Sequence, residues 1–185
     1  MQVRVDPATA ADLVELADVA AATFPLACPP SAAAEDVDAF IVATLSASRF
    51  GQYLADPGRV VLTATDADRV IGYTMLVRRA DISGVDADVP PSVTPRPAVE
   101  LSKMYVMPDW HGSGAAGLLM RAGITWAEAG GARAVWLGVN QGNQRAQRFY
   151  RKHGFGTVGT RTFRLGANLE DDFVMVRPRL PASPA

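Results

Sequence analysis

The stretch with the clearest chemical meaning is a glycine turn at residues 111–116, with the sequence His-Gly-Ser-Gly-Ala-Ala. It follows a β-rich run and precedes a run with helical spacing, so it is predicted to join a strand to a helix. Gly112 and Gly114 allow a sharp turn and a close approach of the backbone to a ligand, because neither carries a Cβ. The free N–H groups and positive dipole end of the following helix suit a phosphate group. A plain packing turn explains the same glycines, and the stretch matches neither GxGxxG nor GxxxxGK[ST].

A second polar cluster begins about thirty residues later, in a helix predicted over residues 143–153. Asn143 can cap its start. The helix carries a basic run made of Arg145, Arg148, Arg151 and Lys152. Arg148 shares a face with Arg145 and with Arg151, so the run could attract phosphates. The alternative is a solvated helix face. His153, next to Gly154, fits a cation at the helix C-terminus better than a ligand.

Together these stretches resemble the acetyl-CoA-binding motifs of the GNAT N-acetyltransferases. Residues 99–108 and then 111–116 are similar to the first motif. Asn143-Gln144-Arg145-Ala146, then Phe149-Tyr150, then Gly154-Phe155 are similar to the second. The resemblance covers residues 1–179 and implies one N-acetyltransferase domain, with 180–185 as a frayed tail. It implies an α/β (α+β) fold, in which helices flank a mixed, mostly antiparallel central sheet.

The resemblance also implies acetyl-CoA as co-substrate and no metal. By the family motif, the residues expected to bind acetyl-CoA are Met104, Tyr105, Val106, His111, Gly112, Ser113, Gly114, Ala115, Ala116, Asn143 and Arg148. Backbone N–H groups near Met104 and Val106 would bind the pantetheine arm and polarise the thioester. Asn143 could instead serve only as a helix cap, or do both. The family usually has Arg or Gln where this chain has His111, so we expect altered phosphate contacts there without loss of function.

The implied reaction, direct attack of an amine on acetyl-CoA, needs an unprotonated amine, an oxyanion stabiliser and an acid for the thiolate. Tyr150 matches the tyrosine that the family places near the CoA sulfur as general acid, and a phenol keeps its proton at neutral pH. The alternative role of Tyr150 is to pack its ring against the core. Glu100 could take the proton of the amine, directly or through water, and on a regular strand it shares a face with Ser102 and Met104. Its alternative is an edge charge or an ion pair with an arginine.

The predicted acceptor is a primary amine, and a polyamine is the finer hypothesis. Four segments look like the polyamine-acetylating branch typified by PaiA proteins: 136–139, 143–155, 162–166 and 172–175. Glu35, Asp36 and Asp38 lie in the helical region that forms the acceptor side in relatives, where carboxylates would attract a polycation. Two alternatives stay open. The chain could be a non-catalytic acyl-CoA-binding regulatory module, or it could acetylate protein N-termini or other peptides.

The elements that position these side chains are predicted to be helices in the first part of the chain and mainly strands after it. Apolar spacing predicts helices over 9–23, 31–45 and 49–55, with Thr9 and Asp12 as a near capping box and Pro25 as a break. A hairpin follows, over 59–65 and 70–78, around Asp66-Ala67-Asp68. The remaining elements are predicted at 99–106 (strand), 112–129 (helix), 134–139 (strand), 143–153 (helix), 155–165 and 172–177 (strands). The proline-rich residues 80–97 form a loop long enough to be functional or mobile.

The composition and charge of the chain limit the functional classes to which it can belong. The chain has 185 residues, 49% of them hydrophobic, and a net charge of −1, which argues against a surface made for nucleic acid or an anionic membrane. Residues 1–100 have a net charge of −7 and residues 101–185 a net charge of +6, which suggests an acidic acceptor side and a basic CoA side.

The single cysteine, Cys28, excludes an intrachain disulfide, and two histidines give little basis for a metal site. With no secretion signal and no membrane-spanning run, we expect a cytoplasmic protein. Relatives often pair through their sheets, which leaves a homodimer open.

Overall fold

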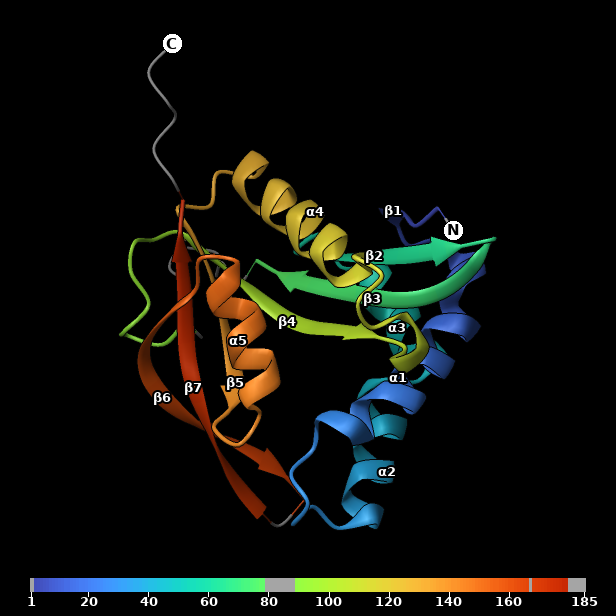
Figure 1. The fold of residues 1–185 in the computed structure, drawn as a ribbon, viewed down its shortest axis with the longest axis horizontal. Coiled ribbons are helices and arrows are strands. Elements are labelled where there is room, and N and C mark those ends of the chain that lie inside the picture. Colours follow the sequence, from blue (N-terminus) through green and yellow to red (C-terminus); the bar gives the residue numbers. More distant parts are fainter. Residues whose placement is uncertain (1, 79–88, 167, 180–185) are drawn as a thin grey trace.

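The centre of the molecule is one seven-stranded sheet with the order β1-β2-β3-β4-β5-β7-β6 (Figure 1). The computed structural model describes residues 2–78, 89–166 and 168–179. The strands are β1 (Arg4–Pro7), β2 (Arg59–Asp66), β3 (Arg69–Val77), β4 (Ala98–Val106), β5 (Ala134–Asn140), β6 (Gly156–Leu165) and β7 (Asn168–Pro178). Neighbouring strands are antiparallel except β4 and β5, which are parallel. The predicted mixed, mostly antiparallel α/β fold is therefore confirmed.

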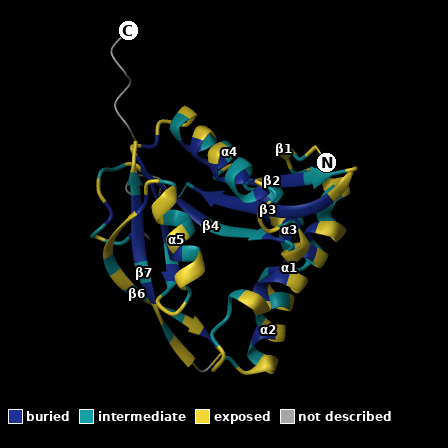
Figure 2. Ribbon diagram, in the orientation of Figure 1, coloured by how far each residue is buried: buried dark blue, intermediate teal, exposed yellow. Residues whose placement is uncertain are grey.

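Helices cover both faces of the sheet. Within the described residues they are α1 (Leu13–Ala27), α2 (Ala34–Thr44), α3 (Ala47–Ala55), α4 (Ala115–Ala129) and α5 (Gln144–Lys152), with short 3-10 helices η1 (Ala10–Asp12) and η2 (Pro108–Trp110). Side chains alternate along a strand, so β3 serves two cores. Its Tyr73 and Met75 pack with α1 and α3, whereas Leu76 packs with α4. Figure 2 shows the buried inner strands between helices with exposed outer faces.

The sheet opens between β4 and β5. These strands pair only at Ala98, Val99 and Glu100, opposite Ala134, Val135 and Trp136. Beyond that point β4 stays with β3, while β5 pairs with β7 along its whole length. The two halves of the sheet therefore diverge, as the angle between β4 and β5 in Figure 1 shows.

A bulge on β4 corrects one sequence expectation. The register with β3 shifts between Met75, opposite Lys103, and Leu76, opposite Leu101, so Ser102 is the extra residue. The strand is therefore not regular. Past the bulge, Tyr105 packs with α1, whereas Met104 packs with the cores that include α4. Glu100 does not share a face with Met104, because one inserted residue exchanges the two faces.

Most predicted elements lie where the sequence put them, with two notable differences. The first helix does not end before Pro25 but continues to Ala27, because a proline in the last turn removes only one backbone hydrogen bond. β7 begins at Asn168 instead of residue 172. The Thr9–Asp12 capping box is present, and Ala67 and Asp68 turn the β2–β3 hairpin with positive φ.

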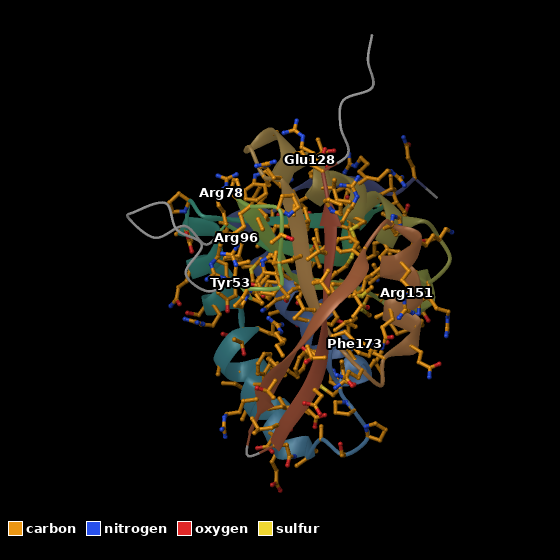
Figure 3. All side chains as sticks on the ribbon, turned by 90° about the vertical axis from the view of Figure 1, so that its left-hand side faces the viewer. Tyr53, Arg78, Arg96, Glu128, Arg151 and Phe173 are labelled. Carbon is orange, nitrogen blue, oxygen red and sulfur yellow. The ribbon has the colours of Figure 1, made fainter. Side chains whose placement is uncertain are left out.

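The proline-rich segment is described only from Val89 onward; residues 80–88 and the predicted tail at 180–185 lie outside the described residues. Val89 and Val93 are buried beneath the sheet, against Trp136. The guanidinium of Arg96, labelled in Figure 3, donates to the carbonyls of Val89 and Pro90, which holds this part of the segment against the sheet. No helix in the described parts of the chain has the length and apolar character needed to cross a bilayer.

Candidate functional site

A cavity of about 1220 Å³ occupies the opening of the sheet. Its walls come from the turn before α4, the diverging β4 and β5, α5, the end of α1, α2, and the β6–β7 hairpin. We call the part beside residues 111–116 the glycine end. The part lined by Phe24, Phe40 and Phe163 is called the aromatic end.

The glycine end has the geometry that the sequence predicts. Gly112 (φ +86°) and Gly114 (φ +90°) are left-handed, a conformation that favours glycine, and open space surrounds the position of a Cβ at either residue. Helix α4 begins directly afterwards, and the Ser113 hydroxyl accepts from the Ala115 N–H at 3.2 Å. Among the hydrogen bonds of the described residues, none uses the N–H of Gly112, Gly114 or Ala116. Free N–H groups at a helix N-terminus form a phosphate site.

His111 joins this turn to α5. Its Nε2 lies 3.0 Å from both the Val106 carbonyl oxygen and Arg145 Nη2, and its Nδ1 lies 3.3 Å from Arg145 Nη1. In the tautomer with Nε2–H, the ring donates to Val106 and Nδ1 accepts from Arg145, whereas in the other tautomer Nε2 accepts from Arg145. The structure therefore brings Arg145 to the glycine end. Arg148, three residues later, is exposed and does not line the cavity. The predicted contact of Arg148 with acetyl-CoA stays a prediction, whereas Arg145 is the arginine of this helix that lines the cavity.

Backbone groups of β4 face the opening between β4 and β5. Met107 N–H donates to Ile71 on the β3 side at 2.9 Å. Backbone direction alternates along a strand, so the N–H groups of Met104 and Val106 point away from β3. These N–H groups point toward the space between β4 and β5, where the two strands are no longer paired. These are the two positions at which the sequence places backbone donors.

Tyr150 lines the middle of the cavity from α5. Its ring contacts Phe149 and Phe155 at centroid distances of 5.7 and 5.9 Å, so it also packs α5 against the core. Burial raises the pKa of Tyr150 to about 12, which keeps the phenol protonated at neutral pH. Asn143 caps α5 by accepting from the Ala146 N–H at 3.0 Å, and it also lines the cavity.

Glu100 lies on the opposite wall and has an arginine partner. Its Oε1 is 3.7 Å from Nη1 of Arg161, and the carboxylate side chain is only 7% exposed. The guanidinium of Arg161 also lies over the ring of Trp136, 5.3 Å from its centroid. The ion pair that the sequence leaves as an alternative is thus present. The role of Glu100 as base stays a prediction.

Two further carboxylates, Glu170 and Asp172 on β7, line the cavity. Asp172 is 6% exposed, and its Oδ2 accepts from Arg161 Nε at 3.4 Å. Burial raises the pKa of Asp172, the Arg161 cation opposes that rise, and the charges of Glu170 and Asp171 add to it. Asp172 is therefore a stronger base than an exposed aspartate. The predicted β7 starts at residue 172 and so excludes Glu170; a strand starting earlier places both on one face.

The aromatic end is a continuous wall of rings. Phe24 and Phe40 stack at 4.6 Å, Phe163 meets Phe40 edge-on at 5.9 Å, and Tyr105 meets Phe24 edge-on at 6.4 Å. Sequence analysis did not assign these phenylalanines to the site. They come from α1, α2 and β6, and only the folded chain brings them together.

Cys28 lies near this wall and lines the cavity. Burial and the charge of Glu170 raise the pKa of its thiol, and the thiol donates to the Phe24 carbonyl at 3.4 Å. Burial also raises the pKa of Tyr105, with contributions from the nearby Tyr150, Cys28 and Asp172. These groups, from four different elements, therefore surround the same space.

The front-half carboxylates are placed differently from the expectation. Glu35, Asp36 and Asp38 do not line this cavity, although α2 does. Asp36 instead lies against the β6–β7 turn, where a Cβ on Gly166 would overlap its carboxylate. These three carboxylates therefore do not support the predicted division into an acidic acceptor half and a basic CoA half. The carboxylates of the cavity come from β4 and β7.

Comparisons with known proteins agree with the fold. The family model for the acetyltransferase (GNAT) family matches residues 20–155. The chain is 54% identical over 166 residues to an uncharacterised N-acetyltransferase of Mycobacterium tuberculosis, covering 90% of this chain and 97% of that protein.

Two solved structures share the fold at low identity. The PaiA N-acetyltransferase of Thermoplasma acidophilum, solved with coenzyme A, has a TM-score of 0.77 at 18% identity and covers 97% of this chain and 100% of its own. A ribosomal-protein-alanine N-acetyltransferase from Brucella melitensis has a TM-score of 0.71 at 21% identity and covers 95% and 99%.

Proposed function

Because the chain belongs to the GNAT family of acetyltransferases, we propose that it transfers the acetyl group of acetyl-CoA to the primary amine of a small molecule. The observation that carries the proposal is the continuity of the cavity. One space runs from the left-handed glycines before α4, past the buried Tyr150 phenol, to carboxylates on β4 and β7. A phosphate site, a proton donor and a proton acceptor therefore line one channel.

At the glycine end, the N–H groups of Gly112, Gly114 and Ala116 would hold the pyrophosphate of acetyl-CoA, and Arg145 adds a positive charge beside them. The N–H groups of Met104 and Val106 would bind the pantetheine arm and polarise the thioester carbonyl. Acetyl-CoA supplies the activated acetyl group. The residues of the chain orient the acetyl-CoA and carry out the proton transfers.

In the reaction, R–NH₃⁺ and acetyl-S-CoA give R–NH-acetyl, CoA-SH and one proton. The ammonium first loses a proton to Glu100, directly or through water. The nitrogen lone pair then forms the C–N bond while the C–S bond breaks. Tyr150 gives its proton to the departing thiolate, and the second proton of the amine leaves to solvent. The proton held by Glu100 then returns to Tyr150 through solvent, so one proton is released overall. The phenol is protonated throughout the neutral range, which a proton donor requires.

Fewer observations support a polyamine as the acceptor. Its support is the likeness of fold to the PaiA structure and the resemblance of the C-terminal segments. The acidic residues of α2 no longer support it, because they lie outside the cavity. We therefore keep the primary amine as the proposed acceptor class and treat spermidine as one member of the test set.

The test is acetyl-CoA-dependent release of free thiol, measured across simple monoamines, spermidine, aminoglycosides, amino acids and short peptides. Release with a small amine, reduced in Tyr150→Phe and Glu100→Gln but retained in Asp109→Asn, is expected. Asp109 is an exposed control outside the cavity wall. Calorimetric binding of CoA without release for any acceptor would favour the non-catalytic module. Release with peptides alone would favour the peptide acetyltransferase.

A further inference from the structure

We propose that the acceptor is a monoamine with an apolar, ring-sized substituent, which lies against Phe24, Phe40 and Phe163 while its ammonium faces Glu170 and Asp172. This inference rests on the proposed function, since it names the acceptor class for the same cavity. It follows from what lines the aromatic end, from the balance of charge there, and from how that end is closed.

The lining of the aromatic end is suited to an apolar group. Phe24 and Phe40 stack nearly in parallel, with an interplanar angle of 9°, and Phe163 meets Phe40 at 71°. Phe40 and Phe163 are only partly buried by the protein itself, and both line the cavity. Ring surface that faces a cavity is stabilised when a ligand removes it from water, and aromatic ligands add edge-on or stacked contacts. A polyamine has no ring to bury against such a wall, so it gains less apolar contact there than an amine that carries a ring.

The charge beside the rings is suited to one ammonium group. Glu170 is directly opposite Phe163 across the β6–β7 pair, and Asp172 is directly opposite Arg161. Arg161 is shared between Glu100 and Asp172, and Glu170 is contacted by the Asn140 amide at 3.5 Å. Glu170 and Asp172 therefore lie on the same strand face as Phe163, where their negative charges would attract an ammonium group. Arg164 also lines the cavity, but it is exposed and alternates to the other strand face from Phe163.

The aromatic end is bounded rather than open to a passing chain. Helix α2 meets β6 through the Phe40–Phe163 contact. At the tip of the hairpin, Asp36 lies against Gly166, so the turn also contacts α2. These contacts close the space between α2 and the hairpin to the following residues of a peptide acceptor. A small molecule needs no such exit.

The first experiment compares kcat/KM for acceptors that differ in the presence of a ring, in charge and in chain length. It uses 2-phenylethylamine, ethylamine, spermidine and a tetrapeptide with an N-terminal phenylalanine. We expect kcat/KM for 2-phenylethylamine to exceed that for ethylamine by at least about tenfold, since burying a ring removes a large apolar area from water. Spermidine or the peptide ranking above 2-phenylethylamine overturns the inference, and so does an equal rate for ethylamine.

Variants then assign the selectivity to residues. Phe163→Ala should raise KM for 2-phenylethylamine about tenfold and leave KM for ethylamine unchanged, whereas Leu169→Ala, an exposed change on the same hairpin, should alter neither. Phe40→Leu provides a milder second variant of the wall. Glu170→Gln should raise KM for both amines, and Asp171→Asn, an exposed neighbour, should not. A loss that is equal for both amines in Phe163→Ala contradicts the assignment.

Calorimetric titration of 2-phenylethylamine into the CoA-saturated protein separates this inference from the proposed function. If no acceptor releases thiol, the proposed function fails, and binding of 2-phenylethylamine that weakens in Phe163→Ala still supports the amine site. If acetyl transfer occurs but 2-phenylethylamine neither binds nor reacts better than ethylamine, the proposed function stands and this inference fails.

Discussion

The guanidinium of Arg161, on the outermost strand β6, lies 3.7 Å from the carboxylate of Glu100 on β4, although β5 and β7 separate those strands. The side chain can reach across because Gly138 on β5 leaves its path clear. A Cβ at Gly138 would overlap the guanidinium. The same guanidinium contacts Asp172 at 3.4 Å. One arginine therefore sets the charge environment of two cavity carboxylates.

Replacing Arg161 should change the pH dependence of the reaction. The cation opposes the upward effect of burial on the pKa of Asp172, so Arg161→Ala should raise that pKa further. Asp172 attracts the ammonium group of the acceptor only when its carboxyl group is ionised, so a higher pKa moves the acid limb of the kcat/KM profile to higher pH. Profiles recorded with saturating acetyl-CoA test this. Arg133→Ala, an exposed arginine outside the cavity wall, is the control, and an unmoved acid limb in Arg161→Ala contradicts the argument.

Removing the Tyr150 hydroxyl should slow the chemical step with little effect on stability. We expect kcat to fall by about 10²-fold in Tyr150→Phe, the usual size of a general-acid contribution, while the ring keeps its contacts with Phe149 and Phe155. The pKa of about 12 means that the phenol loses its proton only in strong alkali, so the alkaline limb below pH 10 should be the same in both proteins. Steady-state kinetics and thermal unfolding together check this. An unchanged kcat would assign Tyr150 to packing alone.

The glycine turn could be predicted from the sequence because its signal is local. Strand, turn and helix follow one another within about twenty residues, and left-handed glycines are a property of residue type. The same holds for the Asn143 cap and the position of Tyr150 on α5. Arg161 and Asp172 could not be found in this way. Their importance depends on the pairing of β6 with β7 and on the open path over Gly138, which involve residues far apart in sequence.

The errors have similarly physical causes. Acidic residues on α2 were expected in the cavity, but the rotation of a helix about its axis is set by packing, and Val37 is the residue that it buries. This rotation leaves Asp36 at the β6–β7 turn. The bulge at Ser102 has no marker in sequence, yet it decides which wall Glu100 occupies. Hydrophobic periodicity locates helices and strands well. It predicts which face a single side chain occupies only where no bulge or other irregularity interrupts the element.

Filling the glycine end should weaken CoA binding beyond the cost of backbone strain. Gly114→Ala places an L residue at φ +90° and a methyl group in the open cradle. We expect a loss of stability of about 1–2 kcal/mol from the left-handed backbone, together with about tenfold weaker CoA binding. Gly131→Ala is a matched control, since Gly131 has φ +85° and open space around its Cβ position but lies at the far end of α4. Equal CoA affinity in the two variants would contradict a phosphate role for the turn.

Two arginines three residues apart on α5 should differ in their effect on acetyl-CoA. Arg145 lines the cavity and contacts His111, whereas Arg148 is exposed and lies outside the wall. Arg145→Ala should therefore raise KM for acetyl-CoA several-fold, by about 3–10-fold for one partly screened charge, and this effect should shrink at 0.5 M salt. Arg148→Ala has the same charge change and helix propensity, so it is the control and should have little effect at either ionic strength. Calorimetry with CoA at both ionic strengths measures the charge contribution without turnover. If Arg148→Ala weakened CoA binding more than Arg145→Ala, the basic run would act as the sequence motif suggests and the contact with His111 would have no part in binding.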